Sequence, residues 1–167
     1  SACERRPFGF RARAPRLTPL TGQGTFATAM PKHKLSDEAA APDVTVIGIS
    51  CHVPDYRLCW SLNKTLGLEL ERRREDIVER VRGKELHYPV FQQSGEEGII
   101  SWALVCNTCG KRRLVPDQKE ADLFLVIDQE TAEREGDLLP RVRSAEFVLL
   151  AFAIEMASLR NGHKLLL

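Results

Sequence analysis

The apolar segments of this chain are short, and prolines or glycines bound most of them. The longest uninterrupted apolar run, residues 147–154, has eight residues. Eight residues suffice for a strand, whereas a membrane-spanning helix needs about twenty. The 167 residues are 43% hydrophobic, a composition that suits one globular domain with a core of its own. The sequence therefore predicts short strands and helices packed into one domain, with no membrane span.

One helix is predicted with clear boundaries. Pro54 is accepted in a first helical turn, and Asp55 beside it favours the positive end of the helix dipole. Four apolar side chains then follow at helical spacing on one face, and Gly67 ends the helix. These apolar side chains are Leu58, Cys59, Leu62 and Leu66. A second, weaker helix is predicted within residues 129–145, where Gly136 and Pro140 interrupt the pattern.

The remaining segments indicate a sheet. Branched and aromatic residues predict buried strands, while 77–81 suggests a short helical turn before Gly83. The clear strands are 44–49, 87–91, 99–105, 123–127 and 147–154, with weaker strand patterns at 68–71 and 111–115. The order β-α-β-β-β-β-α-β and the short hairpins predict an α+β domain. We expect two layers: a mainly antiparallel sheet of about six strands with two helices on one face.

The first 29 residues differ from the rest of the chain. They hold five arginines and one acidic residue, and 20 of the 29 are Ala, Arg, Pro, Gly or Thr. No apolar periodicity is present, so this tail cannot offset the entropy of ordering it. We interpret residues 1–29 as a disordered tail upstream of a natural start at Met30, with 30–167 as the single domain. A twin-arginine export signal lacks its apolar region here, and an organellar presequence is the remaining alternative.

Two stretches of sequence resemble one protein family. Residues 115–123 read Val-Pro-Asp-Gln-Lys-Glu-Ala-Asp-Leu and resemble the signature of the IPExxxVDY family, with Pro116 and Asp122 matching. Val115 and Asp117 are conservative replacements, and two further positions depart from the pattern. Upstream segments resemble the family's opening, first strand and first helix: Lys32–Leu35, Gly48–Ser50, His52, Asp55–Trp60, Leu62–Lys64 and Leu66–Leu68. The resemblance covers about residues 30–156 and implies a small bacterial cytoplasmic protein, but it implies no activity.

The signature also has a physical interpretation. Pro116 cannot donate to a strand ladder and would end the preceding strand. Asp117 can cap the turn that follows. Asp122 stands where that turn re-enters the sheet. We therefore expect Val115, Pro116, Asp117 and Asp122 to act structurally rather than in binding.

A pair of cysteines forms the sharpest local motif. Cys106 and Cys109 are separated by two residues and followed by Gly110, as in one half of a zinc ribbon. Zinc needs four ligands, and no second such pair exists. The other candidate ligands are Cys51, His52, Cys59 and His87. We expect no cofactor and a plain hairpin turn here, with zinc and a redox pair as the alternatives.

No catalytic constellation is recognisable in the sequence. A cysteine nucleophile could be drawn from Cys51 or Cys109 with His52 or His87, but no glycine-flanked elbow or third member accompanies them. The glycines are scattered at turns and form no phosphate-binding loop. We therefore expect a protein that is not an enzyme.

Charge and aromatic side chains suggest two binding surfaces. The formal net charge of +1 argues against binding nucleic acid by bulk charge, and no DNA partner is expected. Two basic clusters could form one polyanion patch if their strands are neighbours: Arg72, Arg73, Arg74, Lys111, Arg112 and Arg113. Tyr56 and Trp60 are four residues apart on the predicted helix, beside Arg57, a composition common in interface hot spots. The alternative is that Trp60 covers the sheet.

These observations lead to one functional prediction and one alternative. We predict a non-catalytic, cytoplasmic module that binds an unidentified protein partner. The alternative is an RNA-associated accessory factor that uses the basic clusters.

Overall fold

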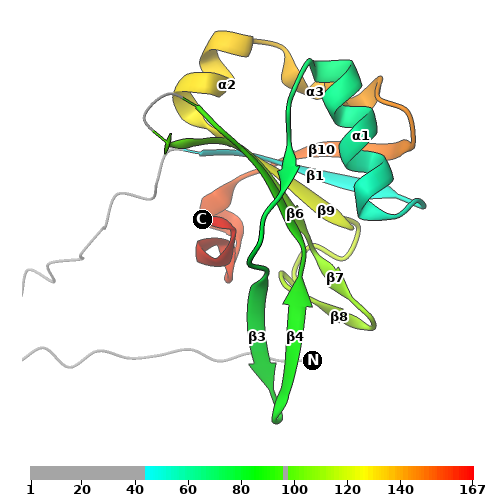
Figure 1. Ribbon diagram of the computed structural model, residues 1–167, viewed down its shortest axis with the longest axis vertical. Coiled ribbons are helices and arrows are strands. Elements are labelled where there is room, and N and C mark those ends of the chain that lie inside the picture. The colour runs from blue at the N-terminus through cyan, green and yellow to red at the C-terminus, as the bar shows by residue number, and fades with distance from the viewer. Residues whose placement is uncertain (1–43, 96–97) are drawn as a thin grey trace, which may run out of the picture. The chain divides into compact units, whose positions relative to one another are not determined.

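The computed structural model describes residues 44–95 and 98–167 (Figure 1). The predicted tail, the start at Met30 and the lead-in to residue 43 lie outside the described residues.

A six-stranded antiparallel sheet organises the domain, as the sequence predicted. Its spatial order is β10-β1-β9-β6-β5-β2, and every neighbouring pair is antiparallel. Two small hairpins, β3–β4 and β7–β8, form separate two-stranded sheets. The strands are β1 Val44–Cys51, β2 Glu71–Arg72, β3 Ile77–Val81, β4 Lys84–Tyr88, β5 Val90–Ser94, β6 Ile100–Cys106, β7 Thr108–Cys109, β8 Arg112–Arg113, β9 Leu123–Asp128 and β10 Val148–Ile154.

The helices form a layer on one face of this sheet (Figure 1). Helix α1, Asp55–Leu66, ends at Gly67, whose φ of 73° suits a residue without a side chain. The helix predicted within 129–145 is two helices, α2 Gln129–Glu135 and α3 Leu138–Arg143. Gly136 separates them with a φ of 68°, so the interruption seen in the sequence is a complete break.

The core between helices and sheet is apolar. Leu58, Leu62 and Leu66 of α1 pack against side chains from the sheet, as their helical spacing predicted. Leu138 and Val142 of α3 extend the same core. This layer, together with the sheet, is the α+β architecture that the sequence indicated.

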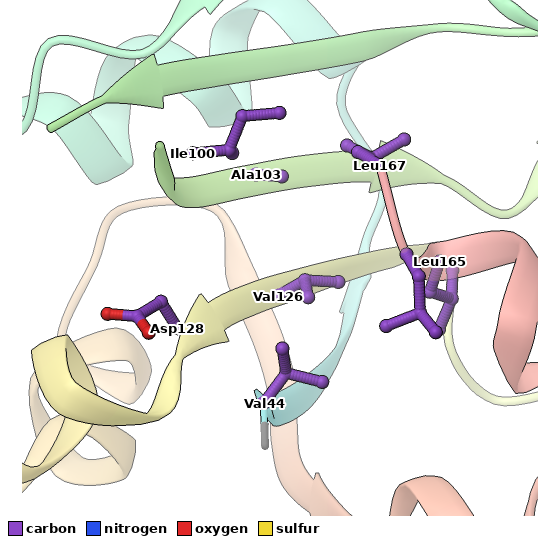
Figure 2. A pocket seen from close by; sticks show the side chains of 8 residues that line it. Val44, Ile100, Ala103, Val126, Asp128, Leu165 and Leu167 are labelled. Atoms are coloured by element: carbon purple, nitrogen blue, oxygen red, sulfur yellow. The ribbon is translucent and has the colours of Figure 1, made fainter. Parts of the chain in front are cut away.

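The opposite face of the sheet carries a second apolar core, which the two-layer prediction did not include. Two 3-10 helices, η2 Met156–Ser158 and η3 Gly162–Leu165, follow β10. Leu159 and Leu165 pack over Val126 and other side chains of that face. In Figure 2, Leu165 and Leu167 lie beside the strands of Val126 and Ala103, around a cavity of about 150 Å³. The C-terminal segment therefore covers part of the face opposite the α-helices.

Four local predictions are wrong. Of the strand predicted at 68–71, only Glu71 is in a strand, because β2 is Glu71–Arg72. Residues 77–81 form strand β3, not a helical turn, and pair with β4 through a turn at Arg82 and Gly83, whose φ angles are 51° and 77°. Two consecutive positive φ angles are typical of a tight hairpin turn. The strand predicted at 87–91 is divided between β4 and β5 at Pro89, which has no N–H to donate. Of 111–115, only Arg112–Arg113 is a strand.

The N-terminus of α2 gives a prediction on pH dependence. The Thr131 backbone N–H donates to the Asp128 carboxylate at 2.9 Å, and this bond lowers the pKa of Asp128 from its ordinary value. Because the folded-state pKa is lowered, the cap stabilises the fold above the unfolded pKa and loses its effect as pH falls through the folded pKa. Asp128→Ala should cost about 1 kcal/mol at pH 7, with a smaller difference near pH 2. Urea unfolding of the native protein and the variant at both pH values measures this difference in free energy of unfolding. An equal difference at pH 7 and pH 2 would contradict the assignment of Asp128 as the charged cap of α2.

Candidate functional site

The exposed side of α1 carries two aromatic side chains. Tyr56 is 63% exposed and Trp60 is 57% exposed, and their spacing of four places them on the same side of the helix. Trp60 therefore does not cover the sheet, and that alternative is wrong. The Lys64 ammonium lies 5.3 Å from the centre of the Trp60 ring, a cation–π distance.

Arg57 links this side of the helix to the start of β10. Its guanidinium lies 4.8 Å from the centre of the Phe147 ring. The Ser61 hydroxyl donates to the Glu146 carbonyl at 2.7 Å, which holds the segment before β10 against α1. We call Tyr56, Arg57 and Trp60 the α1 surface. All three are exposed, and the helix that carries them is anchored by its buried leucines.

Asp122 joins the two stretches that carry the family resemblance. Its Oδ2 accepts from the Ser50 hydroxyl and from the Cys51 backbone N–H, both at 3.1 Å. Its Oδ1 lies 3.8 Å from the Arg113 guanidinium. Its own N–H donates to the Ile49 carbonyl at 2.9 Å. Asp122 thus ties the end of β1 to the start of β9, which supports the structural interpretation of this residue.

The other signature residues are placed differently from expectation. Pro116 does not end a strand, because β8 already ends at Arg113 and Val115 is fully buried in the second core. The Gln118 N–H donates to the Val115 carbonyl at 3.3 Å, so Pro116 and Asp117 are the central residues of a turn. The Asp117 carboxylate makes no hydrogen bond to a described residue, so its predicted capping role is not seen there.

Asn107 is the central polar residue of this region, and sequence reasoning missed it. Its side chain is completely buried. The amide nitrogen donates to the carbonyls of Gln118 and Ala121 at 3.0 and 2.7 Å, and the amide oxygen accepts from the Val115 N–H at 2.8 Å. Its backbone N–H donates to the Asp122 carbonyl, and its carbonyl accepts from the Leu114 N–H, both at 2.8 Å. Asn107 therefore holds the whole segment from 114 to 122 on the end of β6, and its position between Cys106 and Thr108 gave no periodic signal.

A cavity of about 340 Å³ lies where these segments meet at the N-terminus of α1. Its lining includes Cys51, Asp55, Cys106 and Asp122. Burial raises the pKa of the Cys51 thiol, and burial followed by the Asp55 carboxylate raises that of Cys106. Raised pKa values keep both thiols protonated, and a protonated thiol is a poor nucleophile.

The structure places the Cys106 and Cys109 side chains, which carry the zinc alternative, in different cores. The Cys106 thiol packs in the core under the helices, within 3.7 Å of an Asp55 carboxylate oxygen. Cys109 packs against the second core on the other face of the sheet. Of the remaining candidates, Cys59 is on the buried side of α1, and its pKa is raised to about 11 by burial and then by Asp55. Across residues 44–95 and 98–167, no group of three or more His, Cys, Asp or Glu side chains could hold a metal ion.

The two basic clusters lie on strands that are not neighbours. Arg72 belongs to β2, at one edge of the main sheet, whereas Arg112 and Arg113 belong to the separate β7–β8 hairpin. Two of the six charges are also paired, Arg72 with Asp76 and Arg113 with Asp122. The clusters are therefore not on paired strands, which was the arrangement expected for a single polyanion patch. Arg73 and Arg74 instead line a cavity of about 570 Å³ together with Glu69 and Glu71.

Comparison with known proteins identifies no relative. No family model, no curated protein and no solved structure matches the chain. None of the helices in the described part of the chain combines the length and apolar character that a membrane crossing requires.

Proposed function

We propose that this protein is a non-catalytic interaction module of the cytoplasm that binds a protein partner through the α1 surface. The observation that carries the proposal is the exposure of Tyr56 and Trp60, each more than half accessible on a helix whose other side is anchored in the core. The proposal includes divergent membership of the IPExxxVDY family, supported by the way in which Asp122 connects the two resembling stretches.

The physical argument rests on the energetics of aromatic burial. Tyrosine and tryptophan have few rotatable bonds and bury 150–250 Å² each, so they bind a partner at low entropic cost. Arg57 lies beside them with its guanidinium over Phe147, and Tyr, Trp and Arg are the residues most enriched among hot spots. Truncation of a hot-spot residue costs about 2–4 kcal/mol of binding free energy.

Other features of the molecule support binding over catalysis. The thiols of Cys51, Cys59 and Cys106 have raised pKa values, which suits a structural role. The two basic clusters lie on strands that do not pair, and Arg72 and Arg113 form ion pairs. Both features favour a protein partner over RNA, because phosphate backbones are bound by contiguous charge.

The test is co-purification from the host with ribonuclease-treated and untreated lysate. We expect partners to persist after ribonuclease and to fall at least about tenfold with the double variant Tyr56→Ala, Trp60→Ala. Both side chains are exposed, so the free energy of unfolding should change by less than about 0.5 kcal/mol. Val78→Ala is the matched control, because Val78 is an exposed apolar residue on β3 and should retain every partner.

Two results would overturn the proposal. Partners that disappear with ribonuclease would indicate the RNA-associated alternative. Partners that the double variant retains would remove the α1 surface from consideration.

A further inference from the structure

The two edges of the main sheet differ in how they are protected. Strand β2 has only two residues, both charged, and Arg73 and Arg74 follow it. Short, charged edge strands discourage pairing with another chain. Strand β10 has seven residues without a charge, and Leu149 and Leu150 are 64% and 44% exposed. Among the described strands, β10 pairs with β1 alone (Figure 1).

The hydrogen bonds establish which backbone groups of β10 face outward. The Ile49 carbonyl accepts from Asp122, on the β9 side of β1, so the backbone groups of Ile49 point away from β10. Ala151 is opposite Ile49, and its N–H and carbonyl therefore point to the free edge. Consistent with this, the Arg143 Nε donates to the Ala151 carbonyl at 2.9 Å. Ala153, two residues on, has the same orientation.

A hollow adjoins this edge on the helix side. Its volume is about 280 Å³, and Ala153 lies among its apolar lining with Ile47, Leu138 and Leu139. Glu133 and Asp137 also line it, so an apolar side chain suits this hollow better than an acidic one. A strand added to β10 would place the side chain opposite Ala153 beside the hollow, because alternate side chains share a face.

Arg143 supplies a second recognition element two residues away. Its guanidinium lies at the Ala151 carbonyl, and it forms no ion pair with any residue in the described ranges. A carboxylate on an incoming strand, opposite Ala151, would meet this guanidinium. The edge thus offers three main-chain groups for hydrogen bonds, the N–H and carbonyl of Ala153 and the N–H of Ala151, together with an apolar hollow and a cation without an ion pair. The Ala151 carbonyl would join them when the Arg143 guanidinium turns from it to an incoming carboxylate.

We infer that β10 receives an extended segment of the partner protein, paired antiparallel, in which an apolar residue is followed two positions later by an acidic one. The inference rests on the proposed function and assigns the chemistry of the partner. Arg57 contacts Phe147 directly before β10, so this edge continues the α1 surface. A second copy of this chain fits less well. Full antiparallel pairing of two β10 strands centres on Ala151, which would bring both Arg143 guanidiniums together.

The test uses three capped synthetic peptides with the full-length protein. The first is Thr-Val-Thr-Leu-Thr-Glu-Thr, the second has lysine in place of glutamate, and the third is the first with N-methyl groups at its leucine and glutamate. Backbone amide shifts in NMR titrations report binding at Ala151 and Ala153. We expect the first peptide to shift both amides, the lysine peptide to bind roughly fivefold more weakly, and the N-methyl peptide at least about tenfold more weakly.

Protein variants provide the matched comparison. Ala153→Pro removes an outward N–H without removing a bond to β1 and should weaken the first peptide at least about tenfold, whereas Ala153→Val keeps the N–H and should bind it. Arg143→Glu should reverse the preference between the glutamate and lysine peptides. The N-methyl peptide gives the same information with the native protein, so a poorly folded proline variant does not weaken the test.

The inference is overturned if millimolar first peptide shifts neither amide, if N-methylation has no effect, or if a concentration-dependent dimer shifts the β10 amides instead. Failure here is distinguishable from failure of the proposed function. If the edge inference alone is wrong, Tyr56→Ala, Trp60→Ala still loses lysate partners while Ala153→Pro retains them. If the proposed function is wrong, that double variant retains them.

Discussion

Replacement of Asn107 by alanine is expected to lower the free energy of unfolding by about 3–5 kcal/mol, because a buried polar group left without a partner costs about 1–3 kcal/mol. The substitution removes the donor of the Gln118 carbonyl and the acceptor of the Val115 N–H, and it leaves the Ala121 carbonyl with the Arg113 guanidinium as its side-chain donor. Urea unfolding followed by circular dichroism measures the loss.

Two further variants identify the cause of that loss. Thr108→Ala changes the adjacent exposed residue and should alter stability by less than about 0.5 kcal/mol. Asn107→Asp keeps the shape and the acceptor but directs carboxylate oxygen at two carbonyls, so it should be at least as destabilising as alanine. If the aspartate variant were as stable as the native protein, Asn107 would not hold this segment in the way described.

The second large effect is expected at Asp122. Asp122→Ala should cost about 2 kcal/mol, since the Ser50 hydroxyl and the Cys51 N–H lose a charged acceptor and hydrogen bonds to charged groups contribute about 1.5–3 kcal/mol. Asp122 is only partly buried, which places the expected loss toward the lower end of that range. The same unfolding experiment measures it.

Asp117→Ala is the matched control for Asp122, because both are acidic residues of the signature. Asp117 is exposed and makes no side-chain bond to a described residue, so its replacement should change stability by less than about 0.5 kcal/mol. If both variants lost the same free energy of unfolding, the structural role could not be assigned to Asp122, and the turn as a whole would carry it.

The parts of the fold that the sequence predicted are those in which local and long-range preferences agree. Helix α1 has an acidic first turn, a leucine stripe that meets the core and a glycine at its end. The wrong predictions concern segments whose secondary structure is determined by a tertiary partner and not by the local sequence. Residues 77–81 are too few to distinguish a turn of helix from a strand, and β4 supplies the pairing that makes them a strand.

In the candidate site, too, the local sequence predicts some features and tertiary structure determines the others. The spacing of Tyr56 and Trp60 predicts that they share one side of the helix, but their exposure depends on where the sheet lies. Whether Arg72 and Arg113 are neighbours depends on strand order, which local pattern does not encode. Asn107 could not be found at all, because its bonds reach residues 8 to 14 positions away that turn back onto it.

The position of β1 in the sheet has a consequence for biosynthesis. Strand β1 precedes every other described element in the chain, yet both of its neighbours, β9 and β10, are near the end. During translation it therefore leaves the ribosome long before either pairing strand exists. Its apolar residues Val46, Ile47 and Ile49 stay uncovered by the sheet until about 75 to 100 further residues have been added. Pairing across such separations is slow, and the nascent chain is open to chaperone binding throughout that interval.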